Sequence, residues 1–450
     1  MTTLSPVSTS FASGTIKDLV GIGIGPFNLS LAALTDGVPQ IEAAFYDRKP
    51  HFAWHEGLMF PGSILQTSFL KDLVTPVRPT SPHSFLNYLV EHKRFYDFMA
   101  GRFTGVSRQE FAGYMSWVAH RLETTHWNRA AREVTFTDGH FKISFDTETV
   151  HARSLAIATG MQPFIPDWAH PHVGETCFHA SSYLHQKTSM NDKRVVVIGG
   201  GQTGAEIVLN LLTDKGRSPA NVTWISNLSR FSPLEEGAFV DLVFTPDYVD
   251  AYQTMPDDAR KSEVTGQKLA SDGLTPSTID ALYEEIYKRK HLDGAKDSVT
   301  LLPGRHVIDL KESHSGYQVT TQTQATKLHD ECSADIVIMA VGARPKLPDF
   351  MTPVADRIAC DSNGVPHLSP SYEMAFDGRD TARIFGLNMG LASHGIVDPQ
   401  MSLMAWRAGV IVNALMGRQV FDTSPGEEII TWPKGAEAYE DQRPQTAAAG

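Results

Sequence analysis

The chain has 450 residues, of which 42% are hydrophobic and 20% charged, and its formal net charge is −12 at pH 7. These proportions are ordinary for a globular protein with enough chain for two or more domains, and the negative balance argues against nucleic acid or an anionic membrane as the main partner. The cysteines, Cys177, Cys332 and Cys360, are scattered and include no CxxC pair, so a disulfide framework, a zinc cluster and a redox-active dithiol are all unsupported. We therefore expect reduced thiols in the cytoplasm and no metal site.

Both ends of the chain are expected to be flexible tails. Residues 1–16 are rich in Ser and Thr and lack the charged and apolar regions of a signal peptide, and residues 436–450 are rich in Ala, Gln and Glu. No stretch between them approaches the apolar length of a membrane span.

The first predicted strand, Asp18–Ile24, contains a glycine-rich turn that leads into a helix over Phe27–Leu34. Glycines let backbone N–H groups approach a pyrophosphate, and the following helix directs the positive end of its dipole at that charge. The next predicted strand, Ile41–Tyr46, ends at an acid whose carboxylate suits ribose hydroxyls and would repel a 2′-phosphate. We therefore expect this turn and its acid to bind FAD through Gly21, Gly23, Gly25, Pro26 and Asp47, with Pro26 standing where a third glycine is usual.

The segment 48–82 is expected to be a loop, because it is rich in Pro, Gly and aromatic residues, and loops on a rigid scaffold commonly carry function. Helices are predicted over Ser84–Val90 and Arg108–Leu122, and strands over Phe141–Phe145 and Leu155–Ala158.

A second glycine-rich turn follows the predicted strand Val195–Ile198. The next strand, Val222–Ile225, ends in hydroxyls, an amide and an arginine instead of an acid, which fits the 2′-phosphate of NADPH. We therefore expect this turn and its tip to bind NADPH through Gly199, Gly201, Gln202, Thr203, Gly204, Ser226 and Arg230. A lone turn of this type is a weak signal, but two copies in strand–turn–helix context disfavour a single-domain dehydrogenase.

The remaining elements complete an α/β fold with two Rossmann-like domains, the second inserted in the first. Residues 233–292 are expected to form a helical insert over the active site, with one amphipathic helix over Ser277–Lys290. A strand over Ile336–Ala340 closes the second domain, and a strand over Ile384–Leu387 returns to the first sheet above a helix over Gln400–Ala414. The predicted FAD-binding domain is thus residues 17–190 and 346–435, and the NADPH-binding domain is residues 191–345.

Several longer motifs resemble the flavin-dependent N-hydroxylating monooxygenases of siderophore biosynthesis, the L-lysine 6-monooxygenase/L-ornithine 5-monooxygenase family. These motifs are GIGPFNLSLAAL, FAWHEGLMFPGSILQTSFLKDLVTPVRPTSPHSFLNYL, FHASSYL, VIGGGQTGAE and HGIVDPQMSL. The resemblance runs from about Lys17 to about Pro433. It implies that NADPH reduces FAD, that the reduced flavin takes up O₂ as a C4a-hydroperoxide, and that the terminal amine of the substrate becomes an N-hydroxylamine. It also implies a homo-oligomer, either a tetramer or a dimer.

The resemblance assigns roles to several side chains. It implies that Trp54 and His55 lie along the flavin and that Gln66 is the catalytic glutamine near the isoalloxazine and the nicotinamide. It also implies that His394 and Asp398 belong to a late loop beside the flavin, and that Lys71 and Ser402 bind the substrate.

One position departs from the family pattern. Members that use amino acids commonly have a Phe-x-Asn-Glu run whose asparagine helps to bind the α-carboxylate, but this chain has Phe239-Val240-Asp241-Leu242. The anion at Asp241 favours a substrate with a cation at its far end, so cadaverine or a diamine of similar length is preferred. L-Lysine stays open because Lys71 could neutralise Asp241, and L-ornithine comes third.

Two other classes of protein fit less well. Carbon- or sulfur-oxygenating flavin monooxygenases carry an FxGxxxHxxxW-type linker, which the corresponding TCFHASSYLHQ lacks. A nucleotide-sensing protein without turnover would not need the full set of loop motifs.

Overall fold

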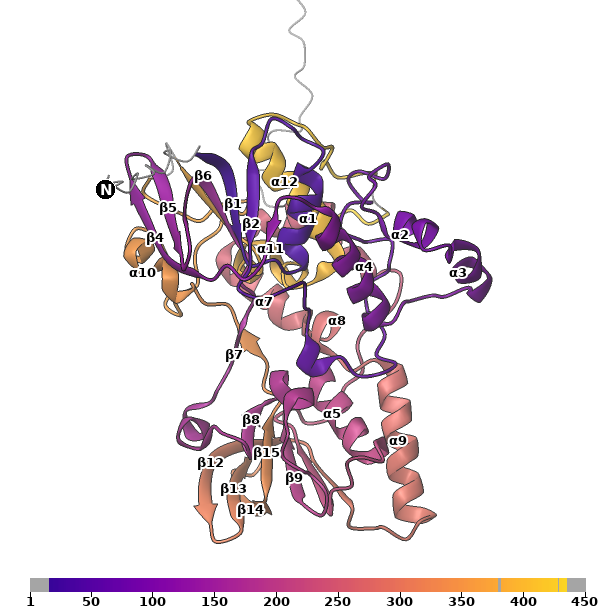
Figure 1. Cartoon of the computed structure of the whole chain (residues 1–450). Coiled ribbons are helices and arrows are strands. Elements are labelled where there is room, and N and C mark those ends of the chain that lie inside the picture. Colours follow the sequence, from indigo (N-terminus) through magenta and orange to yellow (C-terminus); the bar gives the residue numbers. More distant parts are fainter. Residues whose placement is uncertain (1–15, 379–381, 428, 435–450) are drawn as a thin grey trace, which may run out of the picture.

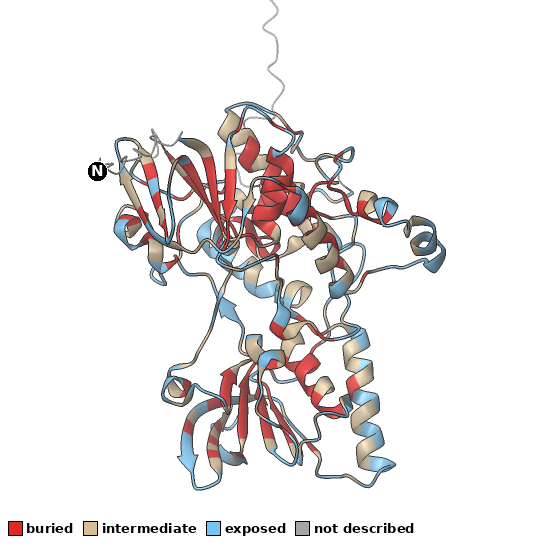
Figure 2. Cartoon of the chain, in the orientation of Figure 1, coloured by how far each residue is buried: buried red, intermediate tan, exposed pale blue. Residues whose placement is uncertain are grey.

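The computed structural model describes residues 16–378, 382–427 and 429–434, and these form two lobes (Figure 1). The predicted tail over residues 436–450 and all but the last residue of the tail over residues 1–16 lie outside the described residues. Each lobe is built around one sheet whose strands are largely buried (Figure 2).

The first lobe holds a seven-stranded sheet with the order β3-β2-β1-β6-β5-β4, in which β17 also pairs with β6. Its strands are β1 (Lys17–Ile22), β2 (Ala43–Tyr46), β3 (Thr125–His126), β4 (Ala131–Thr137), β5 (His140–Phe145), β6 (Thr149–Ile157) and β17 (Arg383–Gly386). β1, β2, β3, β6 and β17 run parallel, whereas β4 and β5 form an antiparallel meander with β6. The return of β17 to this sheet confirms the prediction for Ile384–Leu387.

Both faces of this sheet are covered, which explains why its central strands are apolar at successive positions. Leu19 and Phe45 belong to the core under the helices, whereas Val20 and Ala44 face a second core beside β4 and α10 (Thr352–Ala355). α1 (Pro26–Thr35) packs against α12 (Met404–Met416) and α4 (Arg108–Arg121). The remaining elements of this lobe include α2 (Phe85–Glu91), α3 (Phe95–Gly101), η5 (Asp349–Met351), α11 (Leu391–His394), η6 (Gly395–Val397) and η7 (Met401–Leu403).

The second lobe holds a five-stranded parallel sheet with the order β11-β10-β9-β15-β8. Its strands are β8 (Cys177–His179), β9 (Arg194–Ile198), β10 (Asn221–Ile225), β11 (Val299–Leu302) and β15 (Ile336–Met339). One face is covered by α5 (Gln202–Thr213), on which α9 (Pro276–His291) packs, and α9 matches the predicted amphipathic helix. The other face is covered by an antiparallel sheet that the sequence analysis missed, formed by β12 (Arg305–Ser313), β13 (Gly316–Thr323) and β14 (His329–Ala334).

The chain passes between the lobes through two short strands, β7 (Gln162–Pro163) and β16 (Ala343–Arg344), which pair with each other (Figure 1). The crossing therefore precedes the expected boundary at residue 190, because β8 adds to the parallel edge of the second sheet. η2 (Asp167–His172) and η3 (Ala180–His185) flank β8 on the second-lobe side of this crossing.

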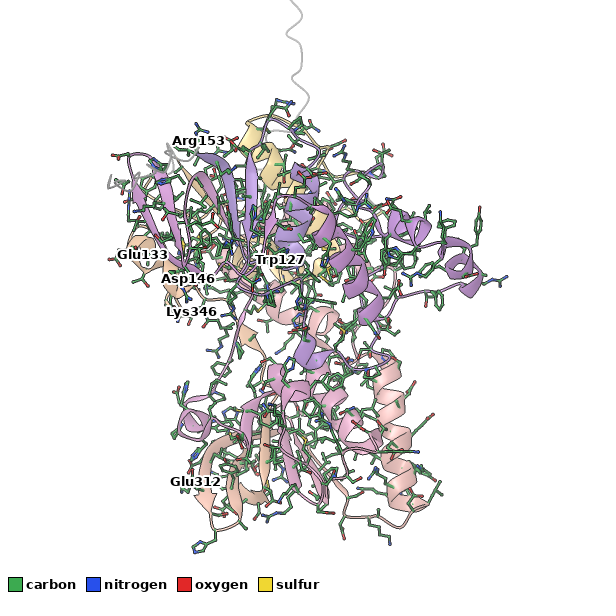
Figure 3. The ribbon with its side chains drawn as sticks, viewed as in Figure 1. Trp127, Glu133, Asp146, Arg153, Glu312 and Lys346 are labelled. Carbon is green, nitrogen blue, oxygen red and sulfur yellow. The ribbon has the colours of Figure 1, made fainter. Side chains whose placement is uncertain are left out.

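The predicted helical insert is divided between the lobes. Its helices are η4 (Asp241–Val243), α6 (Pro246–Gln253), α7 (Asp257–Gly266), α8 (Lys268–Asp272) and α9. α6 and α7 contact α11 and η6 of the first lobe, whereas α9 lies on α5 of the second. Figure 3 shows the side chains of both lobes as sticks, with Glu133 and Arg153 labelled on the first lobe and Glu312 on the antiparallel sheet of the second. Within the described ranges, no helix is both long and apolar enough to cross a bilayer.

Candidate active site

The first glycine-rich turn leaves an open cradle at the N-terminus of α1. Gly23 has φ +88°, and a Cβ there would lie 2.5 Å from the carbonyl oxygen of Ala158, so only glycine fits. Gly25 caps α1 without any side-chain hydrogen bond, and the nearest atom to a Cβ at this position is 4.0 Å away. With Pro26 at the start of the helix, the free N–H groups of the first turn face this space, which fits a dinucleotide pyrophosphate. Gly21 instead packs against Phe45.

Asp47 braces this turn from the end of β2. Its Oδ2 accepts a hydrogen bond from the Ile24 N–H (2.7 Å), and its Oδ1 accepts one from the Lys49 N–H (2.9 Å). The Lys49 ammonium lies 3.6 Å from the carboxylate, whose side chain is 7% exposed. A carboxylate can accept further hydrogen bonds, so its contact with a ribose stays a prediction.

The second turn repeats the arrangement at the N-terminus of α5. Gly199 has φ +127°, and a Cβ there would lie 2.0 Å from the Ala340 carbonyl oxygen, whereas nothing lies within 4 Å of a Cβ on Gly201. A Cβ on Gly204 would lie 2.2 Å from the Gly199 carbonyl oxygen. The buried Trp224 holds that same carbonyl through its indole N–H (2.8 Å). The open space at Gly201 fits a second pyrophosphate.

The polar residues around the second turn have different surroundings. The Gln202 amide points to the insert, donating to Thr278 Oγ1 (3.0 Å) and accepting from the Thr275 N–H (2.9 Å). The Ser226 hydroxyl is buried and accepts from the Leu228 N–H (3.1 Å), so it shapes the turn from inside. In the described part of the chain, the Thr203 hydroxyl has no hydrogen-bond partner, and Arg230 is exposed with Nε 3.3 Å from Ser232 Oγ. Thr203 and Arg230 are thus the side chains most open to a cofactor.

Trp54 and His55 lie in the loop that approaches the second lobe. His55 has φ +48° and precedes η1 (Glu56–Leu58), and its ring meets that of Trp54 edge to face at 5.1 Å. His55 is exposed to solvent, but the protein around it desolvates the imidazole and lowers its pKa, and the charges of Arg108 and Lys49 lower it further. The ring is therefore neutral at neutral pH and can serve as one donor and one acceptor.

The loop that carries Gln66 meets the segment that carries Ser402. Thr67 Oγ1, next to Gln66, is 3.4 Å from Ser402 Oγ, so the loop after β2 meets η7 from the end of the chain. Gln66 is exposed, and its amide has no hydrogen-bond partner among the residues that the structure describes. It is free to bind a ligand.

Lys71 and Asp241 are brought together from segments far apart in the sequence. The Lys71 ammonium donates to the Phe244 carbonyl oxygen, just after η4 (3.4 Å). Burial lowers the pKa of Lys71, and the negative charge of Asp241 partly offsets that effect. The two do not form an ion pair within 4.0 Å among the described side chains, and Asp241 is exposed. Its carboxylate therefore remains available to a ligand.

His394 and Asp398 lie inside the protein and hold the late loop. Asp398 Oδ2 accepts from the Gly390 N–H (2.7 Å), and its Oδ1 is 3.3 Å from the guanidinium of Arg407, with both side chains 1% exposed. His394 stacks on Tyr372 at 3.8 Å, and burial lowers its pKa to about 4. The side chains of His394 and Asp398 are therefore too deeply buried to contact a cofactor, and they instead fix the backbone of the late loop. Arg407 was not predicted from the sequence, although it is a single charge in the apolar run MAWRAGVIVNALM.

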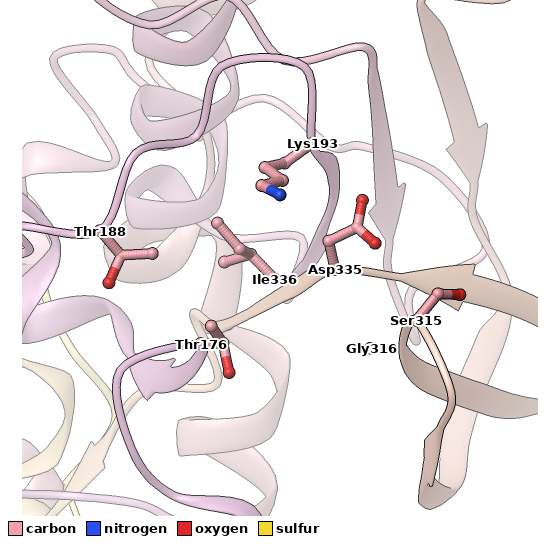
Figure 4. A pocket seen from close by; sticks show the side chains of 7 residues that line it. All are labelled: Thr176, Thr188, Lys193, Ser315, Gly316, Asp335 and Ile336. Carbon is pink, nitrogen blue, oxygen red and sulfur yellow. The ribbon is translucent and has the colours of Figure 1, made fainter.

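A surface hollow of about 330 Å³ in the second lobe lies away from this site (Figure 4). Asp335 and Ile336 at the beginning of β15 line it, together with Thr176, Lys193 and Ser315. The glycine-rich turn lies at the opposite, carboxyl end of the sheet, where ligands of parallel α/β sheets bind. The described residues contain no group of three or more His, Cys, Asp or Glu side chains able to hold a metal ion.

Two nucleotide-binding turns on two linked α/β lobes define a flavoprotein oxidoreductase that uses FAD and NADPH. The chain belongs to the L-lysine 6-monooxygenase/L-ornithine 5-monooxygenase family, whose model matches residues 15–345. It is therefore an NADPH-dependent N-monooxygenase of siderophore biosynthesis.

Three relatives illustrate this membership. The chain is 35% identical over 420 residues to the L-lysine N6-monooxygenase of Escherichia coli, covering 93% of this chain and 99% of the relative. The FAD-bound structure of the cadaverine monooxygenase of the Erwinia amylovora desferrioxamine pathway has a TM-score of 0.87 and 30% identity over 94% of this chain and all of that one. An ornithine N-hydroxylase from Kutzneria, solved with reduced FAD, NADP⁺ and L-ornithine, has a TM-score of 0.82 and 26% identity over 90% of this chain and 99% of that one.

Proposed function

We propose that this enzyme N-hydroxylates the terminal amine of a linear diamine, with cadaverine preferred, for a hydroxamate siderophore. The observation that carries the proposal is the Asp241 carboxylate beside Lys71, where an amino acid would have to place its α-carboxylate. Two like charges 4 Å apart repel each other by about 1 kcal/mol in water and about 4 kcal/mol at an effective dielectric of 20. The second ammonium of a diamine is attracted by the same amount.

The terminal amine of the substrate must be neutral to react. A free alkyl ammonium has a pKa near 10.4, so the amine arrives mostly protonated. A desolvated pocket at the flavin end of the substrate, away from Lys71, would lower the pKa of this terminal amine. The enzyme thereby favours the neutral amine, which is the nucleophile.

The protein holds the reactants, and the cofactors supply the redox chemistry. When bound, NADPH supplies the hydride, and FAD with O₂ supplies the oxygen atom. Gln66 offers an uncommitted amide in the loop that meets Ser402, and Thr203 and Arg230 would bind the phosphates of NADPH. The N-terminus of α1 would bind the pyrophosphate of FAD. Exclusion of water by the insert would protect the oxygen-transfer step.

L-Lysine is the second candidate, because Lys71 provides a cation for an α-carboxylate and Asp241 could then pair with the α-ammonium. The 35% identity to a lysine monooxygenase agrees with this alternative. L-Ornithine ranks third. We further propose that the enzyme acts in the cytoplasm as a homo-oligomer, either a tetramer or a dimer, which light scattering of the purified protein would test.

The test is hydroxylamine formation by the FAD-loaded enzyme with NADPH and each of cadaverine, putrescine, L-lysine and L-ornithine. Efficient product from cadaverine with little from L-lysine supports the proposal. Product from L-lysine alone overturns the diamine assignment but leaves N-hydroxylation intact.

A further inference from the structure

A single carboxylate on α5 joins the two lobes beside the second glycine-rich turn. Glu206 is 8% exposed, and its two oxygens each lie 2.9 Å from a different terminal nitrogen of Arg108. The same carboxylate lies 3.4 Å from the hydroxyl of Ser63. Arg108 and Ser63 belong to the first lobe, whereas Glu206 belongs to the second.

The first-lobe side of this contact is firmly placed. Arg108 begins α4, and its backbone N–H donates to the Ser63 carbonyl oxygen (2.8 Å). The lobes also touch closely nearby, because a Cβ on Gly57 would lie 2.0 Å from the Ser181 carbonyl oxygen. Arg108 is near enough to His55 that its charge helps to lower the pKa of that imidazole. Arg108 thus lies between the predicted flavin segment and α5.

The second-lobe side reaches the cofactor turn within one helical turn. Gln202, the first residue of α5 after Gly201, donates to Glu206 (3.0 Å), while its own oxygen accepts from the Thr275 N–H of the insert (2.9 Å). The glycine-rich turn, the start of α9 and the first lobe are therefore tied to one carboxylate. A bidentate guanidinium–carboxylate pair fixes orientation as well as distance.

Hydride transfer requires reacting atoms about 3–3.5 Å apart, and a misplacement of about 1 Å can cost roughly 100-fold in rate. The turn that holds NADPH lies in one lobe, and the turn that holds FAD lies in the other. We propose that Glu206 and Arg108 are positioning residues for hydride transfer, which set the NADPH turn at its working distance from the flavin site.

The test measures flavin reduction by saturating NADPH under anaerobic conditions in the FAD-loaded Glu206→Gln enzyme. The expected result is a rate constant lower by roughly 100-fold, while FAD content and reduction by dithionite, which does not use the NADPH site, are unchanged. The matched control is Glu110→Gln, on the same helix as Arg108, which removes a bidentate pair with Arg94 that lies wholly within the first lobe (3.0 and 3.1 Å). This control should keep the wild-type rate.

The double variant Arg108→Gln/Glu206→Gln separates positioning from a merely structural role. It leaves no unpaired buried charge, so its thermal stability should exceed that of Arg108→Gln alone, in which the Glu206 carboxylate is left unpaired. Its flavin reduction should stay slow because the ion pair between the lobes is still missing. A Glu206→Gln enzyme as fast as its control, or a double variant whose reduction rate recovers together with its stability, would overturn the proposal.

Discussion

Replacing Asp241 by Asn removes one negative charge with little change in volume, which makes it the sharpest probe of substrate choice. At about 4 Å that charge attracts a second ammonium by about 1 kcal/mol in water and about 4 kcal/mol at an effective dielectric of 20. Because Asp241 is exposed, the lower part of this range applies. The KM for cadaverine should therefore rise roughly 5- to 30-fold. The KM for L-lysine should fall, because the repulsion of its α-carboxylate disappears.

The assay is hydroxylamine formation at varied cadaverine or L-lysine with saturating NADPH. Glu236→Gln is the matched control, since it removes an exposed acid from the same loop five residues before Asp241. The control should leave the ratio of the two kcat/KM values unchanged. A ratio that is also unchanged in Asp241→Asn would refute the assignment of this carboxylate as a diamine selector.

Three further predictions follow from the placement of single residues. Lys71→Met should lower the KM for cadaverine and raise that for L-lysine in the same hydroxylamine assay, because it removes a cation that repels one and attracts the other; a higher KM for both amines would contradict the diamine assignment. Gly201→Ala should fold and retain FAD, since nothing lies within 4 Å of its new methyl group, but it should raise the KM for NADPH in a flavin-reduction assay. An unchanged KM would show that the phosphates of NADPH do not bind at this turn. Burial lowers the pKa of His394 from 6.5 to about 4, so as the pH falls the histidine of the unfolded chain takes up a proton before that of the folded protein. The free energy of unfolding should therefore be highest above about pH 6.5 and should fall by about 3 kcal/mol as the pH drops to about 4. Thermal unfolding at pH 7 and pH 4 should show a smaller pH dependence in His394→Gln than in the unchanged enzyme, and equal dependences would rule this histidine out as the cause.

Much of the α/β scaffold could be predicted from sequence because its signals are local. The two turns need glycine at Gly23 and Gly199, where φ is positive and a carbonyl group lies close, and these constraints are visible as sequence motifs. The strands beside them are short and apolar because both faces are buried. The antiparallel sheet β12–β14 was missed although β13 carries a local strand signal, since Tyr317, Val319 and Thr321 are buried at alternate positions and the residues between them are partly exposed.

The site was predicted less completely, because side-chain direction depends on tertiary packing. The sequence marks Gln202 as part of a cofactor turn, but the hydrogen bond from the Thr275 N–H, 73 positions away, turns its amide toward the insert. His394 and Asp398 belong to a recognisable motif, yet the buried charge of Arg407 holds that segment with both side chains inside. The pairing of Arg108 with Glu206 spans 98 positions and has no sequence signature of its own.

The proposed use of a diamine is tested most directly by competition. Equal concentrations of cadaverine and L-lysine, mixed with the FAD-loaded enzyme, NADPH and O₂, yield two N-hydroxylated products whose initial ratio equals the ratio of the two kcat/KM values. N-Hydroxycadaverine should predominate. Predominance of N6-hydroxylysine would contradict it and assign the Lys71–Asp241 pair to an amino acid.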